Sequence, residues 1–194
     1  MKYYLLLLIN FIVVTLLLGC THKEIITTTI TTRTIIDPRF ISKQIDDKIL
    51  ENRILSILFR DKKLNQTTRI VSTVYQGQVL LTGQSPNYEL IKRAQNLIFN
   101  NYSDVKIYNE IRLNEPITIG QFIKDSWITL KITSIILIKK IHLSTSIKTI
   151  TEDGEVFLLG LVTESEGNQL VQIVSKVSGI KCVNVAFNYL DITK

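Results

Sequence analysis

One short stretch near the start of the chain could undergo covalent chemistry. Residues 17–20 are Leu-Leu-Gly-Cys, which is the lipobox pattern: a signal peptide is cleaved ahead of Cys20, and the cysteine thiol and new amine are acylated. Before it, Lys2 is followed by an uncharged, mostly apolar run from residue 3 to 18, as in a signal peptide. As a helix this run would reach roughly 24 Å, whereas a bilayer core is about 30 Å thick. We therefore predict a signal peptide over residues 1–19 and lipidation of Cys20, rather than an uncleaved anchor.

The net charge and the two cysteines limit the classes of protein to which the chain can belong. Cleavage would leave 194 − 19 = 175 residues, and the loss of Lys2 would lower the net charge from +6 to +5. A mild positive charge suits an acidic surface, but the compartment that a lipobox implies argues against nucleic acid. If Cys20 carries lipid, Cys182 has no disulfide partner. Because Cys182 lies in an apolar run, we expect a buried, inert thiol.

Catalytic and metal-binding patterns are absent from the sequence. The chain has two histidines, His22 and His142, and none of the common nucleophile, phosphate-loop or zinc motifs. Asp46 and Asp47 are neighbours, so on a helix they diverge by about 100° and make a poor acid–base pair; we expect them to complement the helix dipole. We predict that the protein is not an enzyme and has no cofactor, no metal site and no small-molecule substrate.

The chain contains two copies of one unit. Residues 77–83 (GQVLLTG) match residues 154–160 (GEVFLLG) at an offset of 77, and each stretch follows a run rich in β-branched residues. Asp153-Gly154 is a strong signal for a tight hairpin turn, and Gln76-Gly77 is a weaker one. Further strands are expected over residues 105–111 and 180–189.

Helical patterns surround each hairpin, and each predicts a stripe that packs on the sheet. Ser85 with Pro86 should begin the second helix, and Thr163 with Glu166 has the spacing of a capping box. Gly167 should loosen the first turn of the last helix, which Ser178-Gly179 should end. The three predicted buried stripes are Ile45, Ile49, Ile54, Leu55 and Leu58; Leu90, Ala94, Leu97 and Ile98; and Leu170, Val171, Val174 and Val177.

These elements predict an α+β fold with two tandem domains. Each domain should be α-β-β-α-β, with two helices packed on a three-stranded mixed sheet. We place a lipidated spacer at residues 20–44, the first domain at 45–113 and the second at 121–191. Pro116 and Gly120 mark the joint between the domains.

Residues 121–140 form the most unusual expected helix. Its apolar residues exceed what one buried stripe needs, and Asp125 is its single acidic residue among four lysines. An excess apolar face with a Trp and lysines suits a helix lying in a lipid headgroup layer. The alternative is that Trp127 completes the core and the lysines form a solvated face. The candidate lipid-contacting residues are Phe122, Ile123, Lys124, Trp127, Ile128, Lys131, Ile135 and Leu137.

The repeated unit, with Gly-x-Val-x-Leu-x-Gly in its second strand, resembles the BON domain, and a lipobox followed by two such units resembles the dual-BON outer-membrane lipoproteins. The resemblance covers nearly the whole chain and is most specific at residues 37–39, 79–87, 108–112 and 154–164. It implies anchoring in the outer membrane on the periplasmic face. It also implies binding of anionic phospholipid through the second domain, enrichment at division sites and support of envelope integrity.

Together the residues and the resemblance favour a lipid-anchored, palmitate-carrying module that binds anionic phospholipid membrane. Two other readings remain open at this stage. The protein could be an adaptor whose exposed strand edges dock an outer-membrane assembly protein, or it could be a peptidoglycan-associated envelope module.

Overall fold

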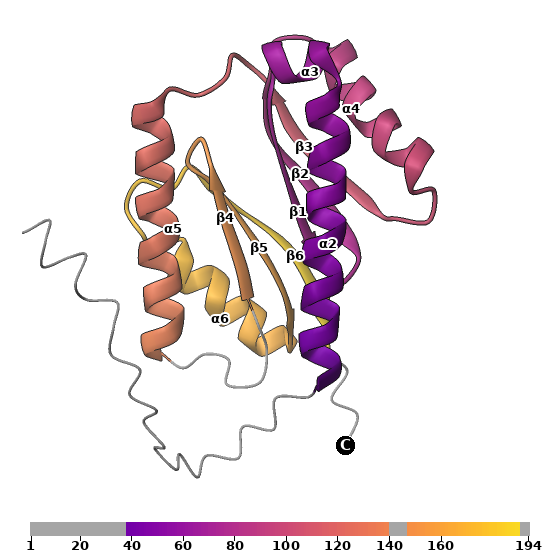
Figure 1. The fold of residues 1–194 in the computed structure, drawn as a ribbon. Coiled ribbons are helices and arrows are strands. Elements are labelled where there is room, and N and C mark those ends of the chain that lie inside the picture. The colour runs from indigo at the N-terminus through magenta and orange to yellow at the C-terminus, as the bar shows by residue number, and fades with distance from the viewer. Residues whose placement is uncertain (1–37, 140–146, 191–194) are drawn as a thin grey trace, which may run out of the picture. The chain divides into compact units, whose positions relative to one another are not determined.

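Two consecutive copies of one α/β unit make up the fold (Figure 1). The structure is a computed structural model that describes residues 38–139 and 147–190, with side chains from Ser42 onward. The first domain consists of α2 (Pro38–Arg60), α3 (Lys62–Thr67), β1 (Arg69–Tyr75), β2 (Gln78–Ser85), α4 (Tyr88–Asn101) and β3 (Ile107–Leu113). The second consists of α5 (Ile119–Lys139), β4 (Ile147–Glu152), β5 (Glu155–Val162), α6 (Glu164–Val174) and β6 (Cys182–Tyr189). The predicted α+β class is confirmed, and the short α3 is an addition.

The two sheets have the same topology and register. Their orders are β1-β2-β3 and β4-β5-β6, and in each sheet an antiparallel hairpin is followed by a parallel third strand. Gly83 pairs with Ile70 in the first hairpin, and Gly160 pairs with Ile147 in the second, so the offset of 77 holds for partners as well as for sequence. Both sheets are mixed, as expected.

Both hairpins close with two residues of positive φ. The angles are 49° and 74° at Gln76 and Gly77, and 49° and 75° at Asp153 and Gly154. Two successive positive φ angles are those of the primed turn, whose twist matches that of the strands. Both predicted turns are therefore present, including the weaker Gln-Gly one.

Helix boundaries differ from the sequence expectation at α2, α4 and α6, and α5 begins at Ile119 rather than at residue 121. α2 begins at Pro38, so residues 38–44 are helical although we expected spacer there; Pro suits a first helical position because its missing N–H would be unpaired anyway. α4 is capped by Asn87, whose side chain accepts from Glu89 N–H, because Ser85 still belongs to β2. α6 ends at Val174, before the expected Ser178-Gly179 stop.

Gly167 has a packing role rather than loosening α6. The predicted capping box of Thr163 and Glu166 is present. A Cβ on Gly167 would lie 3.2 Å from the ring of Phe187, so the glycine lets α6 approach β6. The cost of glycine in a helix is thus offset by close helix–sheet contact.

Each domain has its own core between its helices and one face of its sheet. In the first, Ile54 and Leu58 of α2 pack with α4 and the sheet, but Ile45 and Ile49, which we expected in the same stripe, are exposed. Ile49 and Ile54 are five residues apart, and a helix of 3.6 residues per turn places such residues on different sides. Ile45 and Ile49 therefore lie on another side of α2. In the second, Ile128 and Ile132 pack against β5 and α6.

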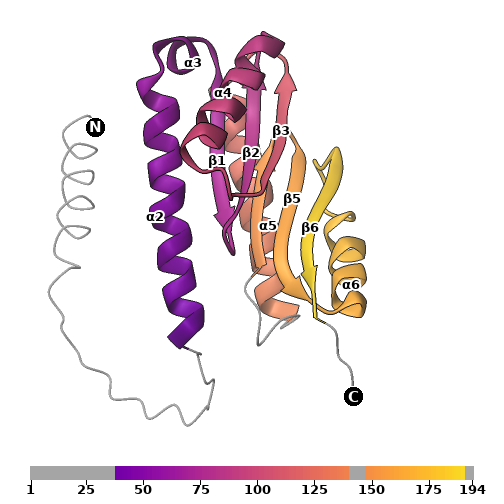
Figure 2. The same cartoon turned by 90° about the vertical axis from the view of Figure 1, so that its right-hand side faces the viewer.

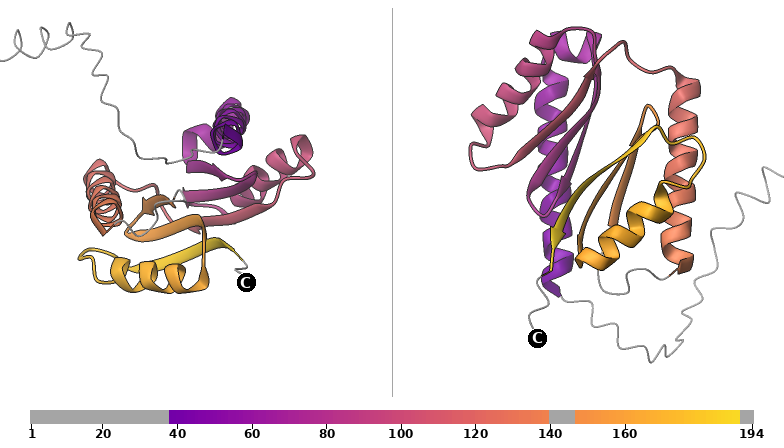
Figure 3. Two further views of the ribbon diagram at one scale, coloured as in Figure 1. Left: turned by 90° about the horizontal axis from the view of Figure 1, so that it is seen from below. Right: turned by 180° about the vertical axis from the view of Figure 1, so that it is seen from behind.

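The faces of the sheets that carry no helices pack against each other. Along β2, Val79 and Leu81 belong to the first core, while Leu80 between them packs with Tyr75, Phe157 and Leu159 in a third cluster. Successive strand residues point to opposite faces, so this cluster joins the backs of the two sheets. Figure 3 shows the helices on the outer sides of the paired sheets. The described residues accordingly belong to one compact unit, Ile35–Lys194.

Candidate functional site

The exposed side of α5 is mostly apolar, with Ser126, Thr133 and Ser134 among its exposed residues. Trp127, the only tryptophan in the chain, is 57% exposed, so it does not complete the core. We call this the α5 face; its exposed apolar members are Ile119, Phe122, Ile123, Trp127, Leu130, Leu137 and Ile138. An exposed apolar patch of this kind on a folded domain is typical of an interaction surface.

The structure corrects the composition of the predicted contact set. Ile128 is only 5% exposed and packs in the core, so it is not part of the α5 face. Ile135 is half-buried. Leu130 and Ile138 are exposed but were not singled out from the sequence. Periodicity could have found Leu130, since it follows Ile123 and Trp127 at helical spacing.

The exposed charges on α5 are all positive. Lys124 and Lys139 are exposed and Lys131 is half-buried, with its ammonium 5.7 Å from the centre of the Trp127 ring. Asp125, the single acidic residue of α5, is only 2% exposed. The α5 face therefore presents apolar groups and lysines without an exposed carboxylate.

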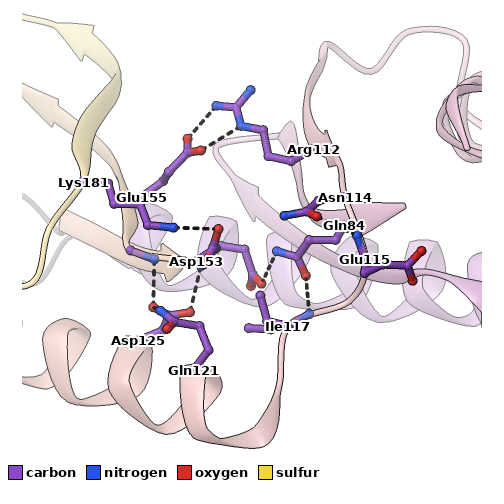
Figure 4. Close-up of polar contacts among 12 residues, drawn as sticks. Gln84, Arg112, Asn114, Glu115, Ile117, Gln121, Asp125, Asp153, Glu155 and Lys181 are labelled. Carbon is purple, nitrogen blue, oxygen red and sulfur yellow. Dashed lines mark hydrogen bonds and ion pairs between the residues drawn. The ribbon is translucent and has the colours of Figure 1, made fainter. Parts of the chain in front are cut away.

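Asp125 is turned inward to bind the hairpin of its own domain (Figure 4). Its carboxylate accepts from Asp153 N–H at 2.8 Å and Gly154 N–H at 2.9 Å, and from the side-chain amide of Gln121 at 2.9 Å. Lys181 pairs with the Asp153 carboxylate at 2.8 Å, and this hydrogen bond raises the pKa of Lys181. These bonds hold α5 against the β4–β5 turn.

In the first domain, a helix carboxylate binds the hairpin turn in the same way. Asp47 of α2 accepts from Gln76 N–H at 2.7 Å and Gly77 N–H at 2.8 Å. The expectation that Asp47 serves the helix dipole is therefore incomplete, because its carboxylate binds a turn 29 residues away in sequence. A hairpin turn leaves N–H groups unpaired, and a helix carboxylate satisfies them in both copies.

A buried polar network links the first domain to the segment that leads into α5 (Figure 4). Gln84 is 1% exposed; its amide donates to Glu152 at 2.9 Å, and its oxygen accepts from Ile117 N–H at 3.3 Å. Arg69 also donates to Glu152. Because Ile117 lies just before α5, this network holds the entry to the helix against the first domain.

Two further ion pairs cross between the domains. Arg112 pairs with Glu155 through two hydrogen bonds of 3.0 and 2.6 Å, and this raises the pKa of Arg112 and lowers that of Glu155. Lys148 of β4 pairs with Glu51 of α2 at 2.9 Å. Burial raises the pKa of Glu51, but hydrogen bonds from Lys48, Lys148 and the Val74 N–H together outweigh it and leave the pKa below its usual value.

Cys182 does not have the environment expected from sequence. It is exposed at the start of the edge strand β6, because only one neighbouring strand covers it. Desolvation and the nearby Glu155 carboxylate raise the pKa of the Cys182 thiol, so the thiol form is favoured. The expectation of a buried thiol was wrong.

Some predicted features lie outside the described residues: Cys20 and the signal peptide, His22, Lys140 and His142. Within residues 38–139 and 147–190, no group of three or more His, Cys, Asp or Glu side chains could hold a metal ion. Over the same ranges, none of the helices is both long and apolar enough to cross a membrane.

The repeated fold with this hairpin and register defines a tandem α/β module, and the sequence matches the BON domain family over residues 46–115 and 124–191. The chain belongs to the BON domain family. It is 36% identical over 173 residues to "Outer membrane lipoprotein DolP" of Haemophilus influenzae, which covers 89% of this chain and 90% of that protein. It is 38% identical over 156 residues to "21 kDa hemolysin" of Actinobacillus pleuropneumoniae, covering 80% of each.

Among solved structures, the C-terminal domain of CdsD, a structural protein of the Chlamydia trachomatis type III secretion system, aligns over 74% of this chain and 67% of that chain. The sequence identity is 15% and the TM-score is 0.30, which is too low to bear on fold or function.

Proposed function

We propose that this protein is an outer-membrane lipoprotein, anchored through Cys20, whose second BON domain binds anionic phospholipid through the α5 face. The lipobox at residues 17–20 supports the anchor. The similarity to a protein named as an outer-membrane lipoprotein supports the compartment, and the resemblance to dual-BON lipoproteins supports the periplasmic face. The protein acts by binding, without catalysis and without a cofactor.

The observation that carries the lipid-binding proposal is the chemical composition of the α5 face. Exposed Trp127 and its apolar neighbours can enter the headgroup layer, where an indole ring is well accommodated. Lys124, Lys131 and Lys139 can then reach anionic headgroups, each contributing about 1 kcal/mol near such a surface. Because the acyl anchor supplies a high local concentration, weak binding by this face is sufficient.

The corresponding helix of the first domain is less suited to an anionic membrane. α2 has an exposed acidic residue, Asp46, which α5 replaces with Lys124 at an offset of 78. Glu51 and Asp61 of the first domain are engaged by lysine or arginine. The difference at Asp46 and Lys124 supports the second domain as the lipid-contacting one.

Vesicle binding by the chain from residue 21 onward, without lipid, tests the proposal. With phosphatidylglycerol vesicles at low salt, the Trp127 emission should shift to the blue, and the protein should co-sediment. Phosphatidylcholine vesicles should give neither effect, and added salt should release the protein because screening shortens the reach of the lysines. Absence of both effects on anionic vesicles would refute the proposal.

Matched variants localise the contact. Trp127→Ala and the double variant Lys124→Gln/Lys131→Gln should each reduce co-sedimentation. The double variant should lower the affinity for vesicles by roughly 30-fold, because two lysines contribute about 2 kcal/mol. Phe99→Ala, which removes an exposed aromatic side chain from α4, is the control and should leave binding unchanged. Equal losses in Phe99→Ala and Trp127→Ala would move the contact away from the α5 face.

The resemblance to dual-BON lipoproteins further supports roles at division sites and in outer-membrane integrity. A fluorescent fusion should then concentrate at the septum, and its Trp127→Ala variant should spread around the envelope. A fusion that stays septal without Trp127 would separate division-site recruitment from lipid binding.

A further inference from the structure

A second exposed stripe runs along α2 in the first domain. Its members are Ile45, Ile49, Asn52, Ser56 and Phe59, all exposed, with Phe59 at 70%. Alternating spacings of four and three residues keep these side chains on one side of a helix. Residues 78 positions later, Ile123, Trp127, Leu130, Ser134 and Leu137, occupy the exposed side of α5. The two copies therefore expose corresponding helix sides, with different side chains.

The α2 stripe, unlike an isolated helix surface, borders a groove. An open cavity of about 600 Å³ lies between α2, α3 and the start of β1, and Figure 2 shows these three elements along one side of the first domain. We call it the α2–α3 groove. Phe59 of α2, Leu64 of α3 and Ile70 of β1 give it an apolar lining, and Asn52, Ser56 and Asn65 add hydrogen-bonding groups. A lining of both kinds suits a peptide, which brings apolar side chains and backbone amides together.

From residue 52 to residue 70, the part of the chain that contains the groove lining, the exposed charged residues are all basic. Arg53, Arg60, Lys62 and Lys63 are exposed. Between residues 52 and 70 the only carboxylate is Asp61, which caps α3 and pairs with Arg93 at 2.6 Å. The hydrogen bond from Arg93 lowers the pKa of Asp61, so it stays ionised and engaged. The two helices that line the groove thus carry four exposed cations between residues 53 and 63, and no free carboxylate over the described residues 52–70.

Three other occupants fit these features less well. A bilayer would have to bury the Asn52 side-chain amide, which lies at the centre of the stripe where α5 has Leu130, and burying an amide without a hydrogen-bond partner is unfavourable. A second copy of the groove would bring like charges together. The segment 20–37 of this chain has two basic and two acidic residues, so it offers no net opposite charge.

We propose that the α2–α3 groove binds an acidic amphipathic segment of another protein. Apolar side chains of that segment would cover Phe59 and the half-buried Ile70, and its carboxylates would pair with Arg53 and the α3 lysines. Asn52 and Asn65 would satisfy polar groups of the bound segment. This places a protein-binding surface on the first domain, separate from the lipid-binding α5 face of the second.

Site-specific photocrosslinking in living cells tests the inference. The photoreactive residue p-benzoylphenylalanine replaces Phe59 in the full chain, and the crosslinked peptides are mapped by mass spectrometry. The same replacement at Phe99, an exposed phenylalanine of α4 that does not line the groove, is the control. We expect a Phe59-specific adduct with a defined segment that carries net negative charge and regularly spaced apolar residues.

Charge reversal supplies the second readout. Arg53→Glu/Lys62→Glu should lower the Phe59 adduct about tenfold by removing two charge contacts, whereas Lys92→Glu on α4 should not. A synthetic peptide of the mapped segment should bind the purified chain with the same dependence. An unchanged urea midpoint would confirm that the variants fold.

The opposite outcomes are equally clear. Adducts only with phospholipid, with a second copy of the chain, or with residues 20–37 would overturn the proposal, as would a mapped segment without net negative charge. No adduct above the Phe99 control would also overturn it. None of these results depends on whether the α5 face binds vesicles.

Discussion

Removal of the Asp125 carboxylate should destabilise the second domain substantially. In Asp125→Ala, the N–H groups of Asp153 and Gly154 lose their acceptor, and the Gly154 contact is buried. A buried donor left without a partner costs about 1–3 kcal/mol. Since the Asp153 contact is only part-buried, water can satisfy it in part, and we expect a loss of roughly 2–4 kcal/mol. This is a large share of the roughly 5–15 kcal/mol typical of a domain.

The first domain provides the matched control. Asp47→Ala removes the same kind of contact, but Gln76 N–H is part-buried and Gly77 N–H is exposed. Water can replace the carboxylate there, so the loss should be about 1 kcal/mol. Asp125→Asn, which keeps one oxygen acceptor, should fall between the two alanine variants.

Urea unfolding followed by circular dichroism and Trp127 fluorescence measures these losses. The order of stability should be wild type, then Asp47→Ala, then Asp125→Asn, then Asp125→Ala. If Asp125→Ala lies within roughly 0.5 kcal/mol of the wild type, the range of an ordinary surface change, the carboxylate does not hold the hairpin. A larger loss in Asp47→Ala than in Asp125→Ala would contradict the reasoning from burial.

Three further predictions follow from local geometry. Gly83→Ala should unfold the first domain, because at φ 117° a Cβ would lie 1.9 Å from a backbone oxygen of β1; loss of the far-UV signal measures this. Gly167→Ala should lower the unfolding free energy by about 1 kcal/mol despite better helix propensity, because the added methyl meets the Phe187 ring; a rise in stability would show that the ring moves aside. Hydrogen bonding from Arg112 lowers the pKa of Glu155 below 4.5, so its stabilising effect is present above that value and lost as pH falls through the lowered pKa. Melting temperatures between about pH 5 and 3 should therefore fall less steeply in Glu155→Gln, by an amount equivalent to at most about 1 kcal/mol because the pair is partly exposed; equal slopes would contradict this.

Local signals in the sequence predicted the repeat and both hairpins. Asp153-Gly154 and the capping box of Thr163 depend on residues within a few positions of one another, so no tertiary information is needed. Which side of a helix is buried is harder to predict. Ile45 and Ile49 are four residues apart and share one side of α2, but that side is opposite to Ile54 and is not covered by the sheet.

Long-range contacts account for most of what sequence reasoning missed in the site. Asp125 binds backbone groups 28 and 29 residues away, and a sequence pattern does not reveal a partner that is a main-chain N–H. Ile128 is buried although it directly follows exposed Trp127, so an error of one position along the helix exchanges a core residue for a surface residue. The exposure of Trp127 itself depended on how much of α5 the sheet covers.

The shared cluster of Tyr75, Leu80, Phe157 and Leu159 has a practical consequence for dissecting the protein. Each half expressed on its own would present a bare hydrophobic sheet to water, in addition to whatever its outer helix exposes. Such fragments should self-associate or precipitate unless the uncovered positions are made polar. Binding measured with an isolated half would then reflect the exposed sheet face, which the other domain covers in the native protein.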